Sequence, residues 1–135
     1  MNNQFDTPVN LKNVTLVEDD PMMRKNLELL LTYFGLEVQN SHEQVDDSLY
    51  QSASKSDLIL LDVNLPGKCN GVEFAEKYSK SYKTPIIFIT GNSDPKVFEK
   101  ACSSNVYAFL NKPFTIDQLN HALKITDLRC GYENH

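Results

Sequence analysis

The stretch DLILLD, residues 57–62, carries the strongest fold signal in this chain of 135 residues. Its four central residues are all apolar, so a strand formed here would offer no polar face to water. Strands buried on both faces are typical of parallel sheets, in which helices cover each side. The stretch therefore predicts a central strand of a parallel α/β sheet, and Asp62 ends that strand with a carboxylate.

Strand-like and helix-like segments alternate on both sides of this stretch. Four further segments are rich in apolar and β-branched residues, although the second and fifth strands of the series have the weaker patterns. Between them, apolar residues recur at the spacing of a helix face. Five repeats of strand and helix predict a doubly wound α/β domain with five helices, a five-stranded parallel sheet and right-handed crossovers. The expected strands are Val14–Val17, Leu36–Val38, Asp57–Asp62, Pro85–Thr90 and Val106–Leu110.

Most of the expected helices have a recognisable start signal. Asp20-Pro21 and Asp94-Pro95 each place an N-cap aspartate before a proline at the first helical position. Ser41 with Gln44, and Thr115 with Gln118, match the spacing of a capping box. The sequence thus predicts helices that begin next to each of these four signals.

Composition and charge narrow the classes of function. With 13 basic and 18 acidic residues the net charge is −5, and the absence of a basic cluster argues against direct binding to nucleic acid. The three cysteines are widely spaced and lack paired histidines, which favours neither disulfides nor zinc and predicts a reducing cytoplasm. No apolar run has the length of a membrane span and no signal peptide is recognisable, so we expect no membrane association.

Polar side chains follow four of the five expected strands. Glu18 and Asp19 end the first strand, Asp62 the third and Thr90 the fourth, and the fifth runs into Lys112. In doubly wound sheets, ligands bind beyond the carboxyl ends of the strands. The five side chains are therefore expected to converge on one edge of the sheet.

The residue types at this edge predict a cation site and a nucleophile. Carboxylates brought together need a counter-charge, and oxygen-only ligands favour a hard divalent ion such as Mg²⁺, with Mn²⁺ as an alternative. A carboxylate can also carry a phosphoryl group as a mixed anhydride, and Asp62 is the candidate nucleophile. Thr90 and Lys112 are suited to bind the phosphoryl oxygens.

Four motifs resemble the receiver domains of two-component response regulators, including the chemotaxis regulators. They are VEDDP after the first strand, LLDVNLPG around Asp62, FITG with Thr90 and FLNKPF with Lys112, and the resemblance covers residues 12–128. It implies a flavodoxin-like strand order of 2-1-3-4-5. It also implies Mg²⁺-dependent transfer to Asp62 from a phosphohistidine of a sensor histidine kinase or a histidine phosphotransfer protein, as in a phosphorelay.

The resemblance also implies a role for each residue of the site. Asp19 becomes a direct Mg²⁺ ligand, Glu18 acts mostly through water, and Asp20 caps the first helix. The backbone carbonyl of Asn64 joins Asp62 as a metal ligand. The implied switch residues are Thr90 and Phe109, three positions before Lys112, and the Lys112-Pro113 peptide is expected to be cis.

The resemblance places the boundaries of the receiver domain at residues 12 and 128. Residues 1–11 then form an N-terminal extension and residues 129–135 a C-terminal tail. Residues 90–128 are the expected output face, which would regulate a protein target or an output domain and could support a phosphorylation-dependent homodimer. The chain is either a stand-alone receiver or a piece of a longer regulator.

Two other functions fit parts of the pattern. A Mg²⁺-dependent phosphatase of the haloacid dehalogenase type also uses an aspartate nucleophile, but its usual second aspartate is replaced here by Asn64. A receiver-like binding module that is never phosphorylated would normally lack the acceptor aspartate or the lysine. The favoured reading is a signalling switch that catalyses only its own phosphorylation and slow dephosphorylation.

Overall fold

The computed structural model describes residues 8, 10–63, 71–91, 95–101 and 104–133. Five strands form one parallel sheet in the order β2-β1-β3-β4-β5. This order and the alternation of strands with helices confirm the doubly wound fold that the sequence predicts. The strands are β1 (Asn13–Val17), β2 (Glu37–His42), β3 (Leu58–Asp62), β4 (Ile86–Thr90) and β5 (Val106–Asn111).

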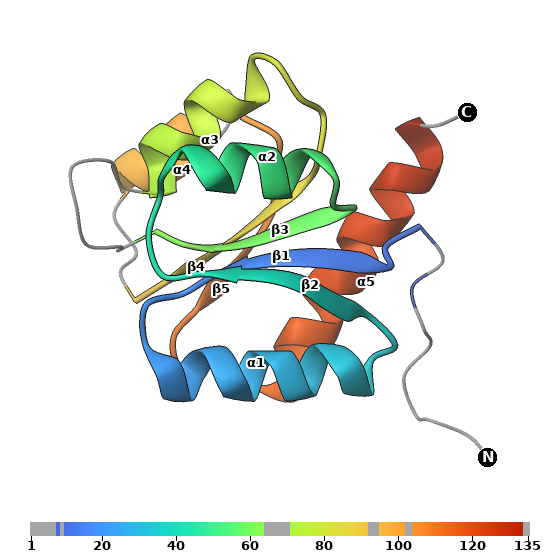
Figure 1. The fold of residues 1–135 in the computed structure, drawn as a ribbon. Helices are drawn as coiled ribbons and strands as arrows, with labels where there is room; N and C mark the ends of the chain where they lie inside the picture. The colour runs from blue at the N-terminus through green and yellow to red at the C-terminus, as the bar shows by residue number, and fades with distance from the viewer. Residues whose placement is uncertain (1–7, 9, 64–70, 92–94, 102–103, 134–135) are drawn as a thin grey trace.

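Helices cover both faces of the sheet (Figure 1). Helices α1 and α5 lie on one face, and α2, α3 and α4 lie on the other. The sheet is therefore the middle of three layers, with an apolar core on each side. The helices are α1 (Pro21–Tyr33), α2 (Asp47–Ser54), α3 (Gly71–Ser79), α4 (Pro95–Ala101) and α5 (Ile116–Glu133).

Strand β3 contributes side chains to both cores. Leu58 and Leu60 pack in the core beneath α1 and α5, whereas Ile59 and Leu61 pack in the core beneath the other three helices. All four side chains are fully buried, as the uninterrupted apolar run predicts. Burial on both faces holds the strand rigidly and fixes the position of Asp62 at its end.

The two edge strands explain the weaker sequence signals. Side chains of β2 alternate between exposed and half-buried, and most of those of β5 are half-buried. Strand β2 continues to His42, so the predicted capping box at Ser41 is wrong. The Ser41 hydroxyl instead donates a hydrogen bond to Glu28 Oε1, and Asp46 caps α2 by accepting from the Leu49 N–H. One face of this edge strand is exposed to water and therefore carries polar residues. Their spacing matched that of a capping box, although they belong to a strand.

Other helix starts agree with the sequence. The Asp20 carboxylate caps α1 by accepting from the Met22 N–H, and Pro21 is the first helical residue. Thr115 and Gln118 form the reciprocal hydrogen bonds of a capping box. Asp94 lies outside the described residues.

Helix α5 continues to Glu133, through most of the segment expected as a tail. On its inner side, the Asp127 carboxylate accepts hydrogen bonds from the backbone N–H groups of Asn10 and Leu11. Leu11 is itself part of the buried core. The residues just before β1 therefore pack against the second half of α5. Within the described ranges, we find no helix with both the length and the apolar character that a membrane crossing needs.

A glycine at the start of α3 allows this helix to approach the end of β3 closely. A Cβ atom at Gly71 would lie 2.7 Å from the carbonyl oxygen of Asp62 and 3.1 Å from Cα of Val63. Both neighbours are backbone atoms of a buried segment, so neither can move aside cheaply. At Gly91, by contrast, a Cβ atom would meet no described atom within 4 Å.

We therefore expect Gly71→Ala to lower the free energy of unfolding by about 1–3 kcal/mol, the usual cost of overpacking. Gly91→Ala is the matched control and should change it by no more than about 0.5 kcal/mol. Urea denaturation of the two variants and the wild type measures both effects. Equal stabilities for the two variants would contradict the close approach of α3 to β3.

Candidate functional site

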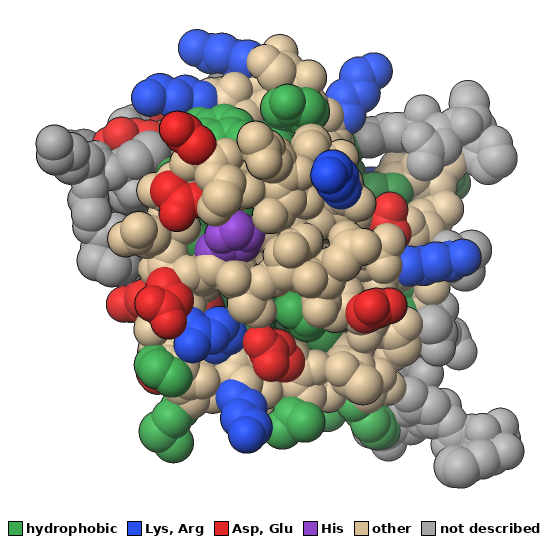
Figure 2. Space-filling view, viewed as in Figure 1, with side chains coloured by type: hydrophobic (Ala, Val, Ile, Leu, Met, Phe, Trp, Pro, Cys, Tyr) green, Lys and Arg blue, Asp and Glu red, His purple; other side chains and the backbone are tan. Residues whose placement is uncertain are grey.

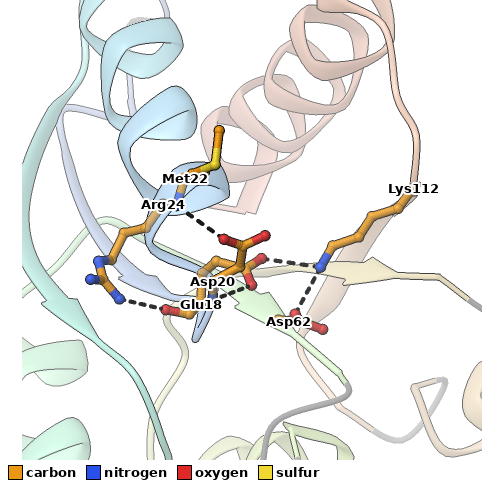
Figure 3. A network of polar contacts seen from close by, with 6 residues as sticks. All are labelled: Glu18, Asp20, Met22, Arg24, Asp62 and Lys112. Atoms are coloured by element: carbon orange, nitrogen blue, oxygen red, sulfur yellow. Dashed lines mark hydrogen bonds and ion pairs between the residues drawn. The ribbon is translucent and has the colours of Figure 1, made fainter.

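The polar residues predicted to converge do meet at the carboxyl edge of the sheet. Glu18 and Asp19 follow β1, Asp62 ends β3, Thr90 ends β4 and Lys112 follows β5. Since all strands are parallel, their carboxyl ends share one edge. Figure 3 shows Glu18, Asp62 and Lys112 pointing toward one another from three different strand ends.

Lys112 bridges two carboxylates. Its Nζ donates a hydrogen bond to Asp62 Oδ2 at 2.9 Å and lies 3.2 Å from Glu18 Oε1. The backbone N–H of Lys112 donates to the carbonyl of Thr90 at 2.8 Å, which ties the lysine to the end of β4. The peptide bond between Lys112 and Pro113 is cis, as expected. Burial disfavours the charged ammonium, but the neighbouring Asp62 and Glu18 outweigh it and hold the pKa of Lys112 above its usual value.

Glu18 is a fully buried carboxylate. Burial raises the pKa of Glu18 from 4.5 to about 7, and the charge of Asp62 adds to this rise. The hydrogen bond that the Asp20 N–H donates to Glu18 Oε2 and the charge of Lys112 both work in the opposite direction. Glu18 Oε1 faces Lys112 but has no hydrogen-bond donor among the described residues. Two buried carboxylates thus share the ammonium of Lys112.

Three carboxylates are arranged in a way that could hold a metal ion. One oxygen each from Glu18, Asp19 and Asp62 lie within 4.8 Å of one another. Two of these residues are buried and Asp19 is exposed, so the cluster opens toward solvent through Asp19. An all-oxygen donor set of this size fits a hard cation such as Mg²⁺. Asn64, the predicted source of a further ligand, lies outside the described residues.

The three consecutive acidic residues have separate local environments. Glu18 is buried, Asp19 contributes to the carboxylate cluster, and Asp20 caps α1. The acidic triplet is therefore more than a solvated loop, because only one of its members has a purely structural role on the helix.

Arg24 also contacts this acidic segment, although its position in the sequence gave no reason to single it out. Its Nη1 donates a hydrogen bond to the backbone carbonyl of Glu18 at 3.0 Å. Figure 3 shows the side chain reaching back from α1 to the end of β1. The closure of the β1–α1 turn brings the two residues together, and no short motif encodes that contact.

The predicted switch residues lie on neighbouring strands. Thr90 is buried at the end of β4. The Phe109 ring, on β5, is half-buried with its centroid 5.9 Å from that of Phe88 and 4.5 Å from that of Phe98. Tyr107, two residues earlier, packs under the guanidinium of Arg129 at 4.0 Å. The Phe109 ring therefore contacts rings of both β4 and α4.

Comparison with known proteins shows the same domain throughout the matched region. The family model described as the response regulator receiver domain matches residues 14–124. The transcriptional regulatory protein CrdR of Helicobacter pylori is 29% identical over 84% of this chain and 54% of that protein. The response regulator ArlR of Staphylococcus aureus is 32% identical over 81% of this chain and 49% of that protein. The chain spans about half the length of these curated relatives.

Solved structures agree with this match. The signal receiver domain of a modulated diguanylate cyclase from Desulfovibrio desulfuricans G20 has a TM-score of 0.79 and 28% identity, covering 91% of this chain and 98% of that one. A CheY-like receiver domain protein from Methanospirillum hungatei JF-1 has a TM-score of 0.79 at 23% identity, with the same coverage of both chains. At 23% identity, the similarity to the Methanospirillum protein concerns the fold alone.

The raised pKa of Glu18 predicts how its contribution to stability depends on pH. The folded state binds this proton more tightly than the unfolded state, so the contribution of Glu18 is fully present below about pH 4.5 and is lost as pH rises through about 7. Glu18→Gln removes this titration. We compare the free energy of unfolding of this variant with that of the wild type in EDTA. The value for the variant minus the value for the wild type should be about 1–3 kcal/mol larger at pH ~8 than at pH ~5.

Urea denaturation at both pH values measures the difference. Glu37→Gln, which changes an exposed side chain of β2, is the control and should behave like the wild type at each pH. A Glu18→Gln effect of the same size at both pH values would contradict the raised pKa.

Proposed function

This chain belongs to the response regulator receiver domain family, and from that premise we propose that it is a phosphoacceptor switch. In this proposal Asp62 accepts a phosphoryl group from a phosphohistidine of a sensor histidine kinase or a histidine phosphotransfer protein. The domain catalyses its own phosphorylation and slow dephosphorylation but turns over no external substrate. It then regulates a protein target or an output domain.

The observation that best supports the proposal is the hydrogen bond between Lys112 Nζ and Asp62 Oδ2. An Asp62 oxygen would attack phosphorus, a new O–P bond would form, and the P–N bond to the donor histidine would break. The electron pair of that bond leaves with the imidazole. Lys112, already next to Asp62, is placed to bind a phosphoryl oxygen as negative charge gathers there. Thr90, at the end of the adjacent strand, is the second proposed phosphoryl ligand.

Glu18, Asp19, Asp62 and the Asn64 carbonyl are the proposed Mg²⁺ ligands, and Mn²⁺ is an alternative ion. When bound, the cation would screen the charge of Asp62 from that of the incoming phosphoryl group. The carboxylate cluster supports this assignment, because its negative charge exceeds what Lys112 alone can offset.

Phosphorylation would act by shifting a population between two states. The phosphoryl group would favour the state in which Thr90 and Lys112 contact it and Phe109 turns inward. Two features of Phe109 support this role: it lies three residues before Lys112, and its ring contacts Phe98 of α4. A swing from 1:99 to 99:1 would require about 5.5 kcal/mol of preference between the states.

The proposed output face comprises residues 90–128, with α4, β5 and α5. A hollow of about 610 Å³ lies on this face, lined by residues of β5 and α5 that include Phe109, His121 and Ile125. We propose that a partner protein, or a second copy after phosphorylation, binds here. Direct contact of this domain with nucleic acid or with a membrane is not part of the proposal, and its proposed location is the cytoplasm.

The first test is phosphorylation by acetyl phosphate and Mg²⁺. We expect one hydroxylamine-labile phosphoryl group on the wild type, because a carboxylate attack yields an acyl phosphate. Asp62→Asn should abolish it, since an amide is a poor nucleophile. Intact mass spectrometry and peptide mapping measure the modification.

Asp57→Asn is the matched control, because it changes an aspartate just before the start of β3, at the opposite end from Asp62. This variant should still be phosphorylated. Continuous release of phosphate over many turnovers would indicate a phosphatase instead. No modification of the folded wild type would indicate a binding module that is not phosphorylated.

The second test concerns the cation. At a Mg²⁺ concentration about 100 times its dissociation constant, binding should raise the free energy of unfolding by about 2.7 kcal/mol. Asp19→Asn should reduce this gain, because Asp19 is a proposed ligand. Asp20→Asn should preserve it, since asparagine also caps helices and Asp20 lies outside the carboxylate cluster. Thermal unfolding with EDTA and with increasing Mg²⁺ compares the variants, and equal responses would count against Asp19 as a ligand.

A further inference from the structure

Two backbone groups of Glu18 form hydrogen bonds, and one of them belongs to the peptide unit that joins Glu18 to Asp19. On the β2 side, the Glu18 N–H donates to the carbonyl of His42 at 2.9 Å. On the α1 side, the Glu18 carbonyl accepts from Arg24 Nη1 at 3.0 Å. The first contact extends the pairing of β1 with β2 by one residue, whereas the second comes from a side chain.

The second contact, from Arg24, restricts the orientation of the backbone at Asp19. The Glu18 carbonyl belongs to the same planar peptide as the Asp19 nitrogen, so holding its oxygen limits rotation of that plane. Asp19 is the exposed member of the carboxylate cluster and lacks the burial that immobilises Glu18 and Asp62. Its side chain therefore depends on the backbone for its position.

Arg24 is itself held in place. Its side chain is 20% exposed, and Nη2 lies 3.4 Å from Oε1 of Glu43, just beyond β2. Because the Glu43 side chain is 70% exposed, the ion pair is weak and serves to orient the guanidinium. The hydrogen bond to the Glu18 carbonyl is partly buried and charge-assisted, so it is the stronger of the two contacts.

We propose that Arg24 is a positioning residue for the cation site, which it serves by fixing the Glu18–Asp19 peptide. This inference rests on the proposed function, since it assumes that the carboxylate cluster binds Mg²⁺. It makes a prediction opposite to that of simple electrostatics. A cationic side chain beside a metal site repels the metal, so loss of its charge alone would tighten Mg²⁺ binding. Loss of a positioning contact would weaken it.

Arg24→Lys tests the proposal, because it keeps the charge but removes the planar fork that reaches both partners. We expect the dissociation constant for Mg²⁺, measured by isothermal titration calorimetry on the full chain, to rise about tenfold, equivalent to about 1.4 kcal/mol. Arg24→Gln, which can still donate one hydrogen bond, should lie between Arg24→Lys and the wild type. Circular dichroism establishes that each variant is folded, and should one unfold, the other carries the test.

Lys25→Ala is the charge control, since it removes one cation from the exposed side of the same helix turn. Its dissociation constant should equal the wild-type value or fall by less than about twofold, because exposed charges are screened by salt. Glu43→Gln should have an effect smaller than that of Arg24→Lys. If the wild type binds Mg²⁺ but both Arg24 variants bind it equally well, the positioning role is overturned and the proposed function stands. If the wild type does not bind Mg²⁺, the proposed cation site fails and this inference fails with it.

Discussion

The parallel sheet brings carboxylates together at one edge, and their mutual repulsion is the constraint on which the site depends. Glu18 and Asp62 are buried at the ends of neighbouring strands, where water screens their charges poorly. Lys112 lies between them and offsets part of this repulsion. One ammonium cannot neutralise three carboxylates, and this imbalance makes the edge suited to a further cation and to an incoming phosphoryl group. Burial raises the pKa of Glu18, and the charge of Asp62 adds to this rise.

The scaffold determines how well this imbalance can be maintained. Strands β3 and β4 are buried along their whole length, so the ends of these strands cannot swing apart to relieve the repulsion. The lysine comes from the edge strand β5 but is tied to the end of β4 by the hydrogen bond to the Thr90 carbonyl. Rigid strand ends thus hold the carboxylates, while the longer lysine side chain can adjust. Such a division suits the proposed transfer of a phosphoryl group to and from Asp62.

The central part of the fold could be predicted from the sequence because strands buried on both faces consist of apolar residues. An apolar run such as that of β3 is compatible with few structures other than a buried strand. Because ligands bind at the carboxyl ends of such strands, Asp62 and Lys112 could then be predicted as site residues. The edge strand β2 was predicted too short, because polar residues serve a half-exposed strand and a helix start equally well. The Ser41 capping box failed for this reason. Local motifs indicate what a segment can form, whereas tertiary pairing with β1 decides what it does form.

The contact between Arg24 and the Glu18 carbonyl is of a kind that sequence cannot predict. It depends on the angle at which α1 leaves the β1–α1 turn and on the side-chain rotamer, neither of which a residue pattern records. Its partner is also a backbone atom, which carries no residue identity at all. Side chains at the edge can be recognised by their chemistry, but the groups that aim them are recognised only by geometry. A Mg²⁺ ion at the proposed site would need its oxygen ligands at about 2.1 Å, so small rotations of a peptide plane would decide whether a carboxylate reaches it. The exposed Asp19, which lacks a buried environment of its own, is where such aiming matters most.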